Sequence, residues 1–402
     1  MKLSMIRKYI NSYFSPYINI FQGFLRPRKN KMIDVLFINH EESGTGAPKL
    51  VYEIAKYISL KYSILMVSKS KGSRHDEFKR TFHEILYPDE IFPKLNIHEK
   101  ARKTLLMTKP GLVYVNSVAS YEYALEAKKL GIPVIFHIHE FERLFYEYIP
   151  KKVALKYFKD SADIFIAVSG SVHKFLTKRL HCDRSNTFLI PGFINPKEIL
   201  LKSKNKSLLT INKEIKKRKD EIIIAALGTC CANKGTGIFI DSYHLLKNRG
   251  FTRLKYIWIG DNVNHIQPFI DKMKNLDKNI FFLGEKENPF PYLNASDIFL
   301  LLSKEDAFPL SALEAISLHK PVISFKRTGE NHRALEGCGM LINKRSPSAL
   351  ANAVIKLSNN IKLRKRYSEH CRLIKHKYDS KILLPRIKRI VDKLYNTSKK
   401  GI

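Results

Sequence analysis

The sequence predicts an α/β protein made of two doubly wound parallel-sheet domains that face a central cleft. Short apolar runs alternate with segments of helical length in both halves of the chain. A lysine-rich stretch at 197–220 separates the two halves. The length of 402 residues suits two or three domains, and a hydrophobic share of 44% is enough for packed cores, which excludes wholesale disorder.

In the first half, strands and helices are expected to alternate from residue 32 onward. The apolar run 33–39 ends in a turn that contains glycine, and Leu50, Ile54 and Ile58 then recur at helical spacing. Pro48 is expected to begin this helix, because its fixed φ suits the first helical position. Further strands are predicted at Ser63–Val67, Leu112–Val115, Val134–Ile138 and Ile164–Val168.

In the second half, the same alternation restarts near residue 221. Strands are predicted at Ile222–Leu227, Lys255–Ile259, Ile280–Leu283, Ile298–Leu302 and Val322–Phe325. Strands that alternate with helices favour a parallel sheet. The expected organisation is a basic amphipathic extension at 1–31, a first domain at 32–196, a linker at 197–220, a second domain at 221–380 and a basic helix or tail at 381–402.

Composition narrows the class of protein further. The chain has 71 Lys and Arg against 37 Asp and Glu, a formal net charge of +34, which favours anionic partners. Its five cysteines lack the CxxC spacing of a zinc site or a disulfide framework, which indicates a reducing cytosol. No apolar run approaches the ~18 residues of a spanning helix, and no secretory leader is recognisable.

The N-terminal segment combines an apolar stripe with basic flanks. Large apolar residues recur there at three- and four-residue steps: Ile10, Tyr13, Phe14, Tyr17, Phe21, Phe24 and Leu25. We expect a helix that begins at Pro16, with Ser15 as its cap. Such a helix would lie in the interface of an anionic membrane, although a helix packed on the protein's own surface is the alternative.

Two acids follow a predicted strand in the second half. Asp306 is expected in the loop, and Glu314 about one turn inside a helix whose first residue is Pro309. Free N–H groups at Leu310 and Ser311 would suit a phosphate, and a carboxylate deeper on the helix can accept hydrogen bonds from a ribose. The alternative is that Asp306 only caps the helix.

A glycine turn follows the first predicted strand of the second half. Gly228 and Thr229 come directly after that strand, and Lys234 stands at the mouth of the next helix. This arrangement suits a diphosphate, whose charge must be neutralised when it leaves. The spacing of the glycines and the lysine is not that of a Walker loop, and an exposed turn of no function is the alternative.

Two motifs of the first half fall at strand ends. The loop Ser43–Pro48 contains Gly44 and Gly46, which let the backbone approach a ligand closely, but it lacks the dinucleotide fingerprint. The pair His137 and His139 closes another strand. No third ligand is spaced to complete a zinc site, so we expect no metal here and instead a histidine that hydrogen-bonds a sugar.

Together these motifs resemble the retaining GT-B glycosyltransferases of family 4. The resemblance covers about Met32 to Ser398, and it depends on the order and spacing of several short matches. They are Ser43–Pro48, Val113–Ser117, His137–Glu140, Val168–Ser169, Ile190–Asn195, Asn233–Gly235, Ala295–Phe299 and Glu305–Ala315. The resemblance implies a GT-B fold of two Rossmann-like domains, the first on the acceptor side and the second binding a nucleotide sugar.

The resemblance also implies roles for single residues. Lys234 would hold the donor diphosphate, Glu314 the ribose, and Asp306, where the family usually has Glu, hydroxyls of the transferred sugar. With His139 facing the reacting sugar, the implied catalytic residues are His139, Asp306 and Lys234. The implied donor-binding residues are Gly44, Gly46, Gly228, Thr229, Lys234, Phe308, Pro309, Leu310, Ser311 and Glu314, and the acceptor-side residues are Thr45, Asn116 and His137.

The implied activity is metal-independent, retaining transfer of a hexose-type sugar from a nucleotide-diphosphate sugar, without a cofactor. The expected acceptor is a membrane-linked glycan or glycolipid in bacterial surface polysaccharide assembly, at the inner face of the cytoplasmic membrane. Two alternatives stay open: a nucleotide-sugar epimerase of the same fold, and a basic nucleic-acid-binding protein. Against the second, the sequence contains no recognised nucleic-acid-binding module, so no nucleic-acid partner is expected.

Overall fold

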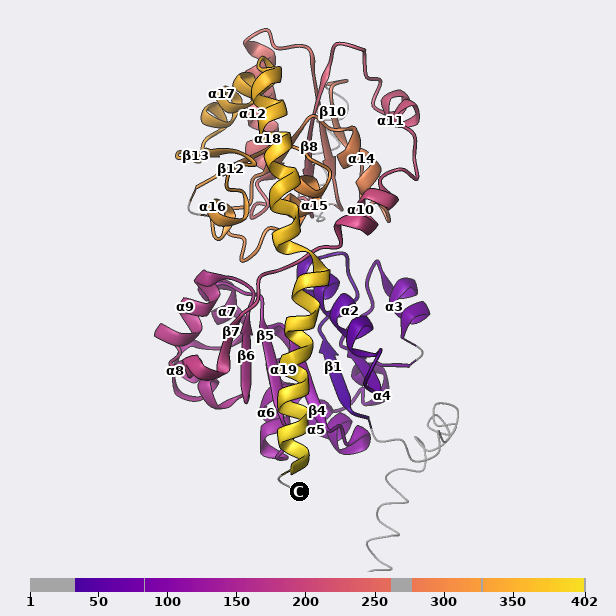
Figure 1. The fold of residues 1–402 in the computed structure, drawn as a ribbon, viewed down its shortest axis with the longest axis vertical. Helices are drawn as coiled ribbons and strands as arrows, with labels where there is room; N and C mark the ends of the chain where they lie inside the picture. Colours follow the sequence, from indigo (N-terminus) through magenta and orange to yellow (C-terminus); the bar gives the residue numbers. More distant parts are fainter. Residues whose placement is uncertain (1–32, 83, 262–276, 327, 401–402) are drawn as a thin grey trace, which may run out of the picture.

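The computed structural model describes residues 33–82, 84–261, 277–326 and 328–400. Two α/β domains are stacked along the long axis of the molecule, each built around one parallel sheet (Figure 1). This confirms the predicted fold class. The apolar stripe and basic flanks predicted at 1–31 lie outside the described residues.

The first sheet has seven parallel strands within the described residues, in the order β3-β2-β1-β4-β5-β6-β7. They are β1 (Val35–Asn39), β2 (Ile64–Ser68), β3 (Ile85–Leu86), β4 (Leu112–Asn116), β5 (Val134–Ile138), β6 (Ile164–Ala167) and β7 (Thr187–Leu189). The sequence did not predict β3 and β7. Both lie at the edges of the sheet and are too short to show an apolar run of strand length.

Helices connect these strands in the order that a doubly wound sheet requires. They are α2 (Gly46–Ile58), α3 (His75–Thr81), α4 (Pro88–Ile91), α5 (Ile97–Thr108), α6 (Tyr121–Lys129), α7 (Glu142–Tyr148), α8 (Lys151–Tyr157) and α9 (Gly170–Lys178). The predicted stripe of Leu50, Ile54 and Ile58 is buried. The expected start of this helix was wrong: it begins at Gly46, and Pro48 is its third residue, where a backbone N–H also has no partner inside the helix.

The second sheet has six parallel strands in the described part of the chain, in the order β10-β9-β8-β11-β12-β13. They are β8 (Ile222–Leu227), β9 (Leu254–Ile259), β10 (Ile280–Phe282), β11 (Ile298–Leu301), β12 (Val322–Phe325) and β13 (Gly339–Ile342). The edge strand β13 was not predicted. Its glycine and partly exposed side chains give a weak strand pattern.

The helices of the second half include two inside the lysine-rich stretch. These are α10 (Pro196–Lys202) and α11 (Leu208–Glu214). The others are α12 (Thr236–Asn248), α14 (Phe290–Ala295), α15 (Leu310–Ser317), α16 (Asn331–Ala334), α17 (Pro347–Ser358) and α18 (Ile361–Ile374). Among the described residues, no helix has the length and apolar character needed to cross a bilayer.

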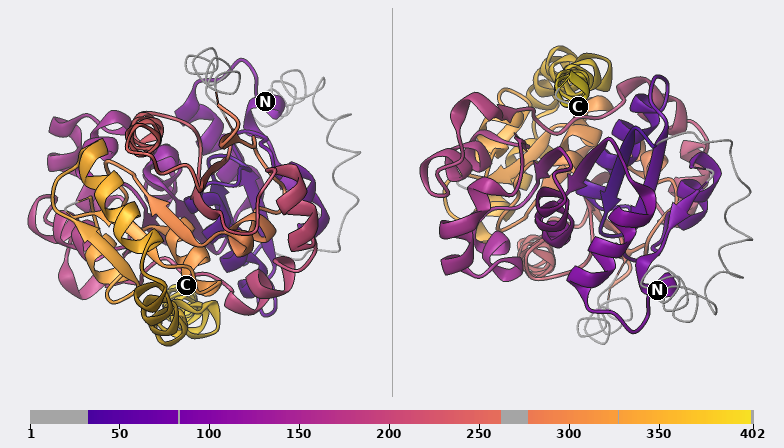
Figure 2. Two further views of the ribbon diagram at one scale, coloured as in Figure 1. Left: turned by 90° about the horizontal axis from the view of Figure 1, so that it is seen from above. Right: turned by 90° about the horizontal axis from the view of Figure 1, so that it is seen from below.

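The C-terminal helix α19 (Ser380–Lys400) returns to the first domain and packs along its outside (Figures 1 and 2). The Tyr395 hydroxyl donates to Asp34 at the start of β1, and Lys61 pairs with Asp392 at 3.0 Å. The chain therefore crosses between the domains twice. The two crossings lie side by side, because the Ser380 N–H donates to the Ile194 carbonyl at 2.8 Å.

Candidate active site

The order of strands fixes where a ligand can bind. In each sheet the order in which successive strands are added reverses at one point, between β1 and β4 in the first and between β8 and β11 in the second. Open parallel sheets bind ligands at the carboxyl ends of strands beside such a reversal. Segments that follow the carboxyl ends of strands in the two sheets meet across the domains: Lys49 pairs with Glu314 at 2.9 Å, Arg143 with Glu305 at 3.1 Å, and the Ser171 hydroxyl donates to Glu330 at 3.0 Å.

Lys234 and Asp306 lie together at the carboxyl end of the second sheet. The Lys234 ammonium is 3.2 Å from the Asp306 carboxylate, which also accepts from the Ser303 hydroxyl at 3.2 Å. The Asp306 charge raises the pKa of Lys234. The lysine stem lies against Gly228, within 3.9 Å of the position that a Cβ would take. The structure thus brings the predicted glycine turn, lysine and first acid to one place.

The backbone around Lys234 is tied to the loop that carries Asp306. The Lys304 N–H donates to the Asn233 carbonyl at 2.6 Å, and the Asp306 N–H donates to Thr328 at 2.9 Å. Gly235 follows the lysine with a φ of +83°, and a Cβ there would lie 2.5 Å from the Leu302 carbonyl oxygen. Only glycine fits this turn without moving the backbone.

Replacement of Gly235 by alanine is therefore expected to displace Lys234 and to lower both stability and transfer activity. Gly250→Ala is the matched control, because Gly250 has a φ of +81° and nothing within 4 Å of its Cβ position. Urea unfolding should show that Gly235→Ala costs about 1–3 kcal/mol more than Gly250→Ala. Equal stability and equal transfer rates in the two variants would contradict the close approach to Leu302.

Glu314 is the second predicted acid, and it lies inside α15 as expected. Its side chain is 5% exposed. One carboxylate oxygen pairs with Lys49 from α2 of the other domain, and the second oxygen has no hydrogen-bond partner within the described residues. A buried carboxylate oxygen without a donor is available to a ligand hydroxyl.

His139 faces Asn116 across the carboxyl ends of β4 and β5. The Asn116 amide donates to the Ala47 carbonyl at 3.1 Å, which turns the amide oxygen toward His139 Nε2, 2.8 Å away. Nε2 must then carry the proton, and Nδ1 keeps its lone pair. Burial and the neighbouring His137 and His40 hold the pKa of His139 well below its usual value, so the ring is neutral at pH 7.

His137 packs beside His139 in the interior of the first domain. The sequence placed His137 on the acceptor side, but its side chain is buried and its Nδ1 lies 2.9 Å from the Tyr114 hydroxyl. The two histidine rings are 4.1 Å apart, and burial lowers the pKa of His137 to about 3. The two residues are two positions apart, so their side chains point to the same face of the sheet, and His137, inside β5, is the more buried of the two.

The loop before α2 is closed by its own side chains. Glu41 accepts from the Ser43 hydroxyl at 2.6 Å and from the Thr45 hydroxyl at 3.0 Å. Gly44 lies 3.6 Å from a Glu285 carboxylate oxygen, measured from its Cβ position, and Gly46 lies 3.5 Å from Leu310. Both glycines thus border the second domain, as the sequence predicted for a loop at the cleft.

The turn before α15 differs from the expected one. Pro309 is the cap and not the first helical residue, and the Leu310 N–H donates to the Phe308 carbonyl at 3.0 Å, so it is not free for a phosphate. Phe308 and Leu310 pack against Gly192 at the first interdomain crossing. The other donor-side candidates, Ser311 in the first turn of α15 and Thr229 in the loop after β8, are partly exposed.

Lys49 and Glu140 are site residues that the sequence did not single out. Glu140 is buried and accepts from the Ser117 hydroxyl and from the N–H groups of Val118 and His139. Burial raises the pKa of this carboxyl, against the effect of these hydrogen bonds. Glu140 thereby fixes the backbone at His139. Lys49 lies in the first turn of α2, directly after the glycine loop. This position beside a predicted ligand-binding loop was the feature of the sequence that could have identified it.

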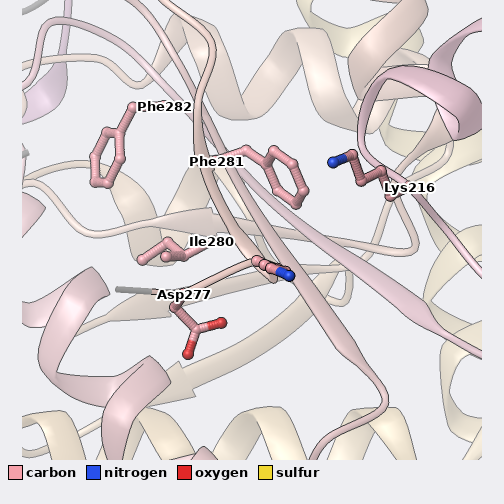
Figure 3. A pocket seen from close by; sticks show the side chains of 6 residues that line it. Lys216, Asp277, Ile280, Phe281 and Phe282 are labelled. Atoms are coloured by element: carbon pink, nitrogen blue, oxygen red, sulfur yellow. The ribbon is translucent and has the colours of Figure 1, made fainter. Parts of the chain in front are cut away.

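A surface hollow of about 240 Å³ lies beside β10, lined by Lys216, Asp277, Lys278, Ile280, Phe281 and Phe282 (Figure 3). The acidic residue of this hollow, Asp277, already has partners within the protein, because it pairs with Lys247 at 2.6 Å and accepts a hydrogen bond from the Tyr243 hydroxyl. The described residues contain no group of three His, Cys, Asp or Glu side chains that could hold a metal ion. The interdomain loops therefore remain the candidate active site.

Comparisons with known proteins identify the family of the chain. Residues 44–198 match the family model described as Glycosyltransferase Family 4, and residues 221–360 match Glycosyl transferases group 1. An uncharacterized glycosyltransferase of Methanocaldococcus jannaschii is 24% identical over 332 residues, which are 80% of this chain and 71% of the relative. The two matched regions contain the two facing sets of loops.

Two further comparisons support the same assignment. The capsular polysaccharide biosynthesis glycosyltransferase CapM of Staphylococcus aureus is 26% identical over 264 residues, 63% of this chain and 66% of the relative. The crystal structure of Anabaena HepE in complex with UDP and glucose superimposes with a TM-score of 0.75 at 17% identity, covering 90% of this chain and 100% of HepE. The chain belongs to the glycosyltransferases of the family 4 type and has their GT-B fold.

Proposed function

We propose that this glycosyltransferase moves a hexose-type sugar from a nucleotide-diphosphate sugar to a glycan or lipid-linked acceptor, with retention of configuration. The observation that carries the proposal is the grouping of Lys234, Asp306 and Glu314 at the carboxyl end of the second sheet, where Arg143, which follows His139 in the chain, pairs with Glu305. A cation beside two acids suits a donor that has a diphosphate, a ribose and a sugar with free hydroxyls.

The nucleotide is UDP in this proposal. HepE has been crystallised with UDP and with UDP-glucose, and its chain is covered along its whole length. The unpartnered oxygen of Glu314 would accept hydrogen bonds from the ribose, and Lys234 would contact the diphosphate. Asp306 would lose its pairing with Lys234 as the donor binds, and would then accept from hydroxyls of the sugar.

Transfer needs the bond between the anomeric carbon and the donor phosphate to break. Negative charge then develops on the leaving diphosphate, and Lys234 stabilises it. The acceptor hydroxyl attacks from the face that the phosphate leaves, and its proton passes to a phosphate oxygen. Neutral His139 accepts a hydrogen bond from a sugar hydroxyl at Nδ1, because the hydrogen bond to Asn116 keeps the ring proton on Nε2. These positions give retention without a covalent enzyme intermediate.

The charge and the relatives support the proposed acceptor and location. CapM is named for capsular polysaccharide biosynthesis, and the net charge of +34 favours an anionic surface. We place the enzyme at the inner face of the cytoplasmic membrane, acting in surface polysaccharide assembly. The test is a panel of UDP-, GDP- and ADP-sugars, each assayed for hydrolysis and for thermal stabilisation. UDP-sugars should give both effects, and a response to none of the three classes would contradict the proposal.

Transfer is expected to persist in excess EDTA. The positive charge that the leaving diphosphate needs would come from Lys234 and not from a bound metal, so chelation should change the rate less than twofold, about 0.4 kcal/mol or less in barrier height. The measurement is the initial rate with and without the chelator. Complete loss of activity, restored by magnesium or manganese, would show that the diphosphate is bound through a metal.

A further inference from the structure

The lysine-rich stretch 197–219 has no role in the proposed chemistry. It holds nine Lys or Arg and two Glu, which leaves seven positive charges in excess. Both glutamates are paired within the stretch, Glu198 with Lys202 at 2.7 Å and Glu214 with Lys206. The other seven cations form no ion pair with an acid in the described part of the chain. They are Lys197, Lys204, Lys213, Lys216, Lys217, Arg218 and Lys219.

Four leucines of the same stretch are exposed. They are Leu200, Leu201, Leu208 and Leu209, and the side chains of Leu201 and Leu209 are 69% and 74% exposed. Single exposed leucines are common on protein surfaces, but four within ten residues are an unusual concentration of exposed apolar side chains. We call these four leucines and the seven cations the Leu–Lys surface.

The exposure of the leucines is fixed by the packing of α10 and α11. Asn195 caps α10 and Ser207 caps α11, each accepting from a backbone N–H at 3.2 Å. Ile211 and Ile215 are fully buried on the inner side of α11, and Lys206 donates to the Tyr292 hydroxyl of α14 at 2.8 Å. With these contacts made, the leucines on the outer side have no core to enter.

We propose that the Leu–Lys surface docks on an anionic lipid bilayer. This inference rests on the peripheral membrane location proposed above, and it assigns that contact to described residues other than 1–31. Leucines enter the boundary between headgroups and acyl chains, and the surrounding lysines face anionic headgroups. The chemistry fits a bilayer better than a nucleic acid, which would leave the leucines in water.

Charge also argues against two other occupants. The segment 1–33 holds seven Lys or Arg and no acid, so it would be repelled by a surface with seven excess positive charges. A second copy of this chain carries the same surface and a net charge of +34. An anionic bilayer neutralises the cations and covers the leucines together.

Docking there would bring the bilayer beside the cleft. Helices α10 and α11 follow one another along one edge of the second domain (Figure 1). Helix α10 packs against α15, which carries Glu314. The lipid surface would therefore lie next to the donor helix, where a lipid-linked acceptor could reach the cleft without leaving the membrane.

The test is co-sedimentation of the full chain with vesicles of phosphatidylglycerol and phosphatidylcholine, compared with phosphatidylcholine alone. The double variant Leu201→Ser/Leu209→Ser should lower the partition coefficient about 10- to 100-fold, since two apolar side chains no longer enter the lipid. The matched control is Leu60→Ser/Leu373→Ser, which removes leucines that are 81% and 73% exposed elsewhere and should bind as the unmodified chain does.

A second variant separates the electrostatic part. Lys204→Ser/Lys213→Ser should weaken binding about tenfold at low salt and much less at high salt, because salt screens exposed charges. UDP-sugar hydrolysis is measured on every variant and should not change. If no UDP-sugar is hydrolysed but the chain and its variants bind vesicles as expected, the result would count against the proposed function and not against the docking surface.

Three outcomes would overturn the docking surface. The first is that the unmodified chain fails to bind the anionic vesicles at low salt. The second is that the Leu201→Ser/Leu209→Ser variant binds as tightly as the unmodified chain, which would assign the contact to another segment such as 1–31. The third is that duplex DNA displaces the Leu201→Ser/Leu209→Ser variant and the Leu60→Ser/Leu373→Ser control from vesicles equally well, which would show that the surface binds through charge alone.

Discussion

Replacing Lys234 with alanine should lower the rate of sugar transfer by about 10²–10³, which corresponds to about 2–4 kcal/mol of transition-state stabilisation. The ammonium is the cation that the structure places beside Asp306 at the carboxyl end of the second sheet. Its removal leaves the charge of the departing diphosphate without a partner. The effect should fall on kcat as well as on kcat/KM, because this charge grows as the bond breaks.

The control for Lys234→Ala is Lys247→Ala. Lys247 also pairs with an aspartate in the same domain, Asp277 at 2.6 Å, but beside the surface hollow and away from the interdomain loops. The Lys247→Ala variant should retain the full rate of sugar transfer, and its change in thermal stability should be similar to that of Lys234→Ala. If both variants lost transfer equally, or if Lys234→Ala turned over at a near-normal rate, the phosphate site would be assigned wrongly.

The second large effect is expected for Glu314→Ala. A hydrogen bond to a charged group contributes about 1.5–3 kcal/mol, so losing the ribose contact should lower kcat/KM by about 10- to 150-fold. Since the ribose does not react, most of the loss should appear as a higher KM for the donor. The variant also frees Lys49 from its 2.9 Å pairing across the domains.

Glu221→Ala is the control for this prediction. Glu221 lies 3.6 Å from Lys255, and both side chains are as buried as Glu314, but they stand where β8 and β9 begin, at the opposite edge of the sheet. A comparable loss of stability with an unchanged donor KM is expected. Thermal stabilisation by UDP should also disappear in Glu314→Ala and persist in Glu221→Ala. Full stabilisation of Glu314→Ala by UDP would contradict the ribose contact.

The central strands of both sheets were predictable because they are buried on both faces. Such strands appear as continuous apolar runs, and β5, β8 and β12 occupy the predicted residues. The site residues that follow these runs were predictable for the same reason, since a parallel sheet gathers its carboxyl ends along one edge. This reasoning singled out Lys234, Asp306 and Glu314, which the structure brings to the carboxyl end of the second sheet.

Contacts between distant segments were not predictable from local patterns. The pairing of Lys49 with Glu314 joins residues 265 positions apart, and neither helix pattern shows it. The burial of His137 depends on Tyr114 of the neighbouring strand. The helices α10 and α11 were missed because their exposed leucines and lysines give no one-sided apolar stripe.

The return of α19 to the first domain has a consequence for biosynthesis. Tyr395 and Asp34 form a hydrogen bond across 361 positions of the chain, and Ile387 and Val391 are fully buried. Domains generally fold in order as they leave the ribosome. Here the first domain emerges before the second but lacks α19, so its outer face stays uncovered while the whole second domain is synthesised.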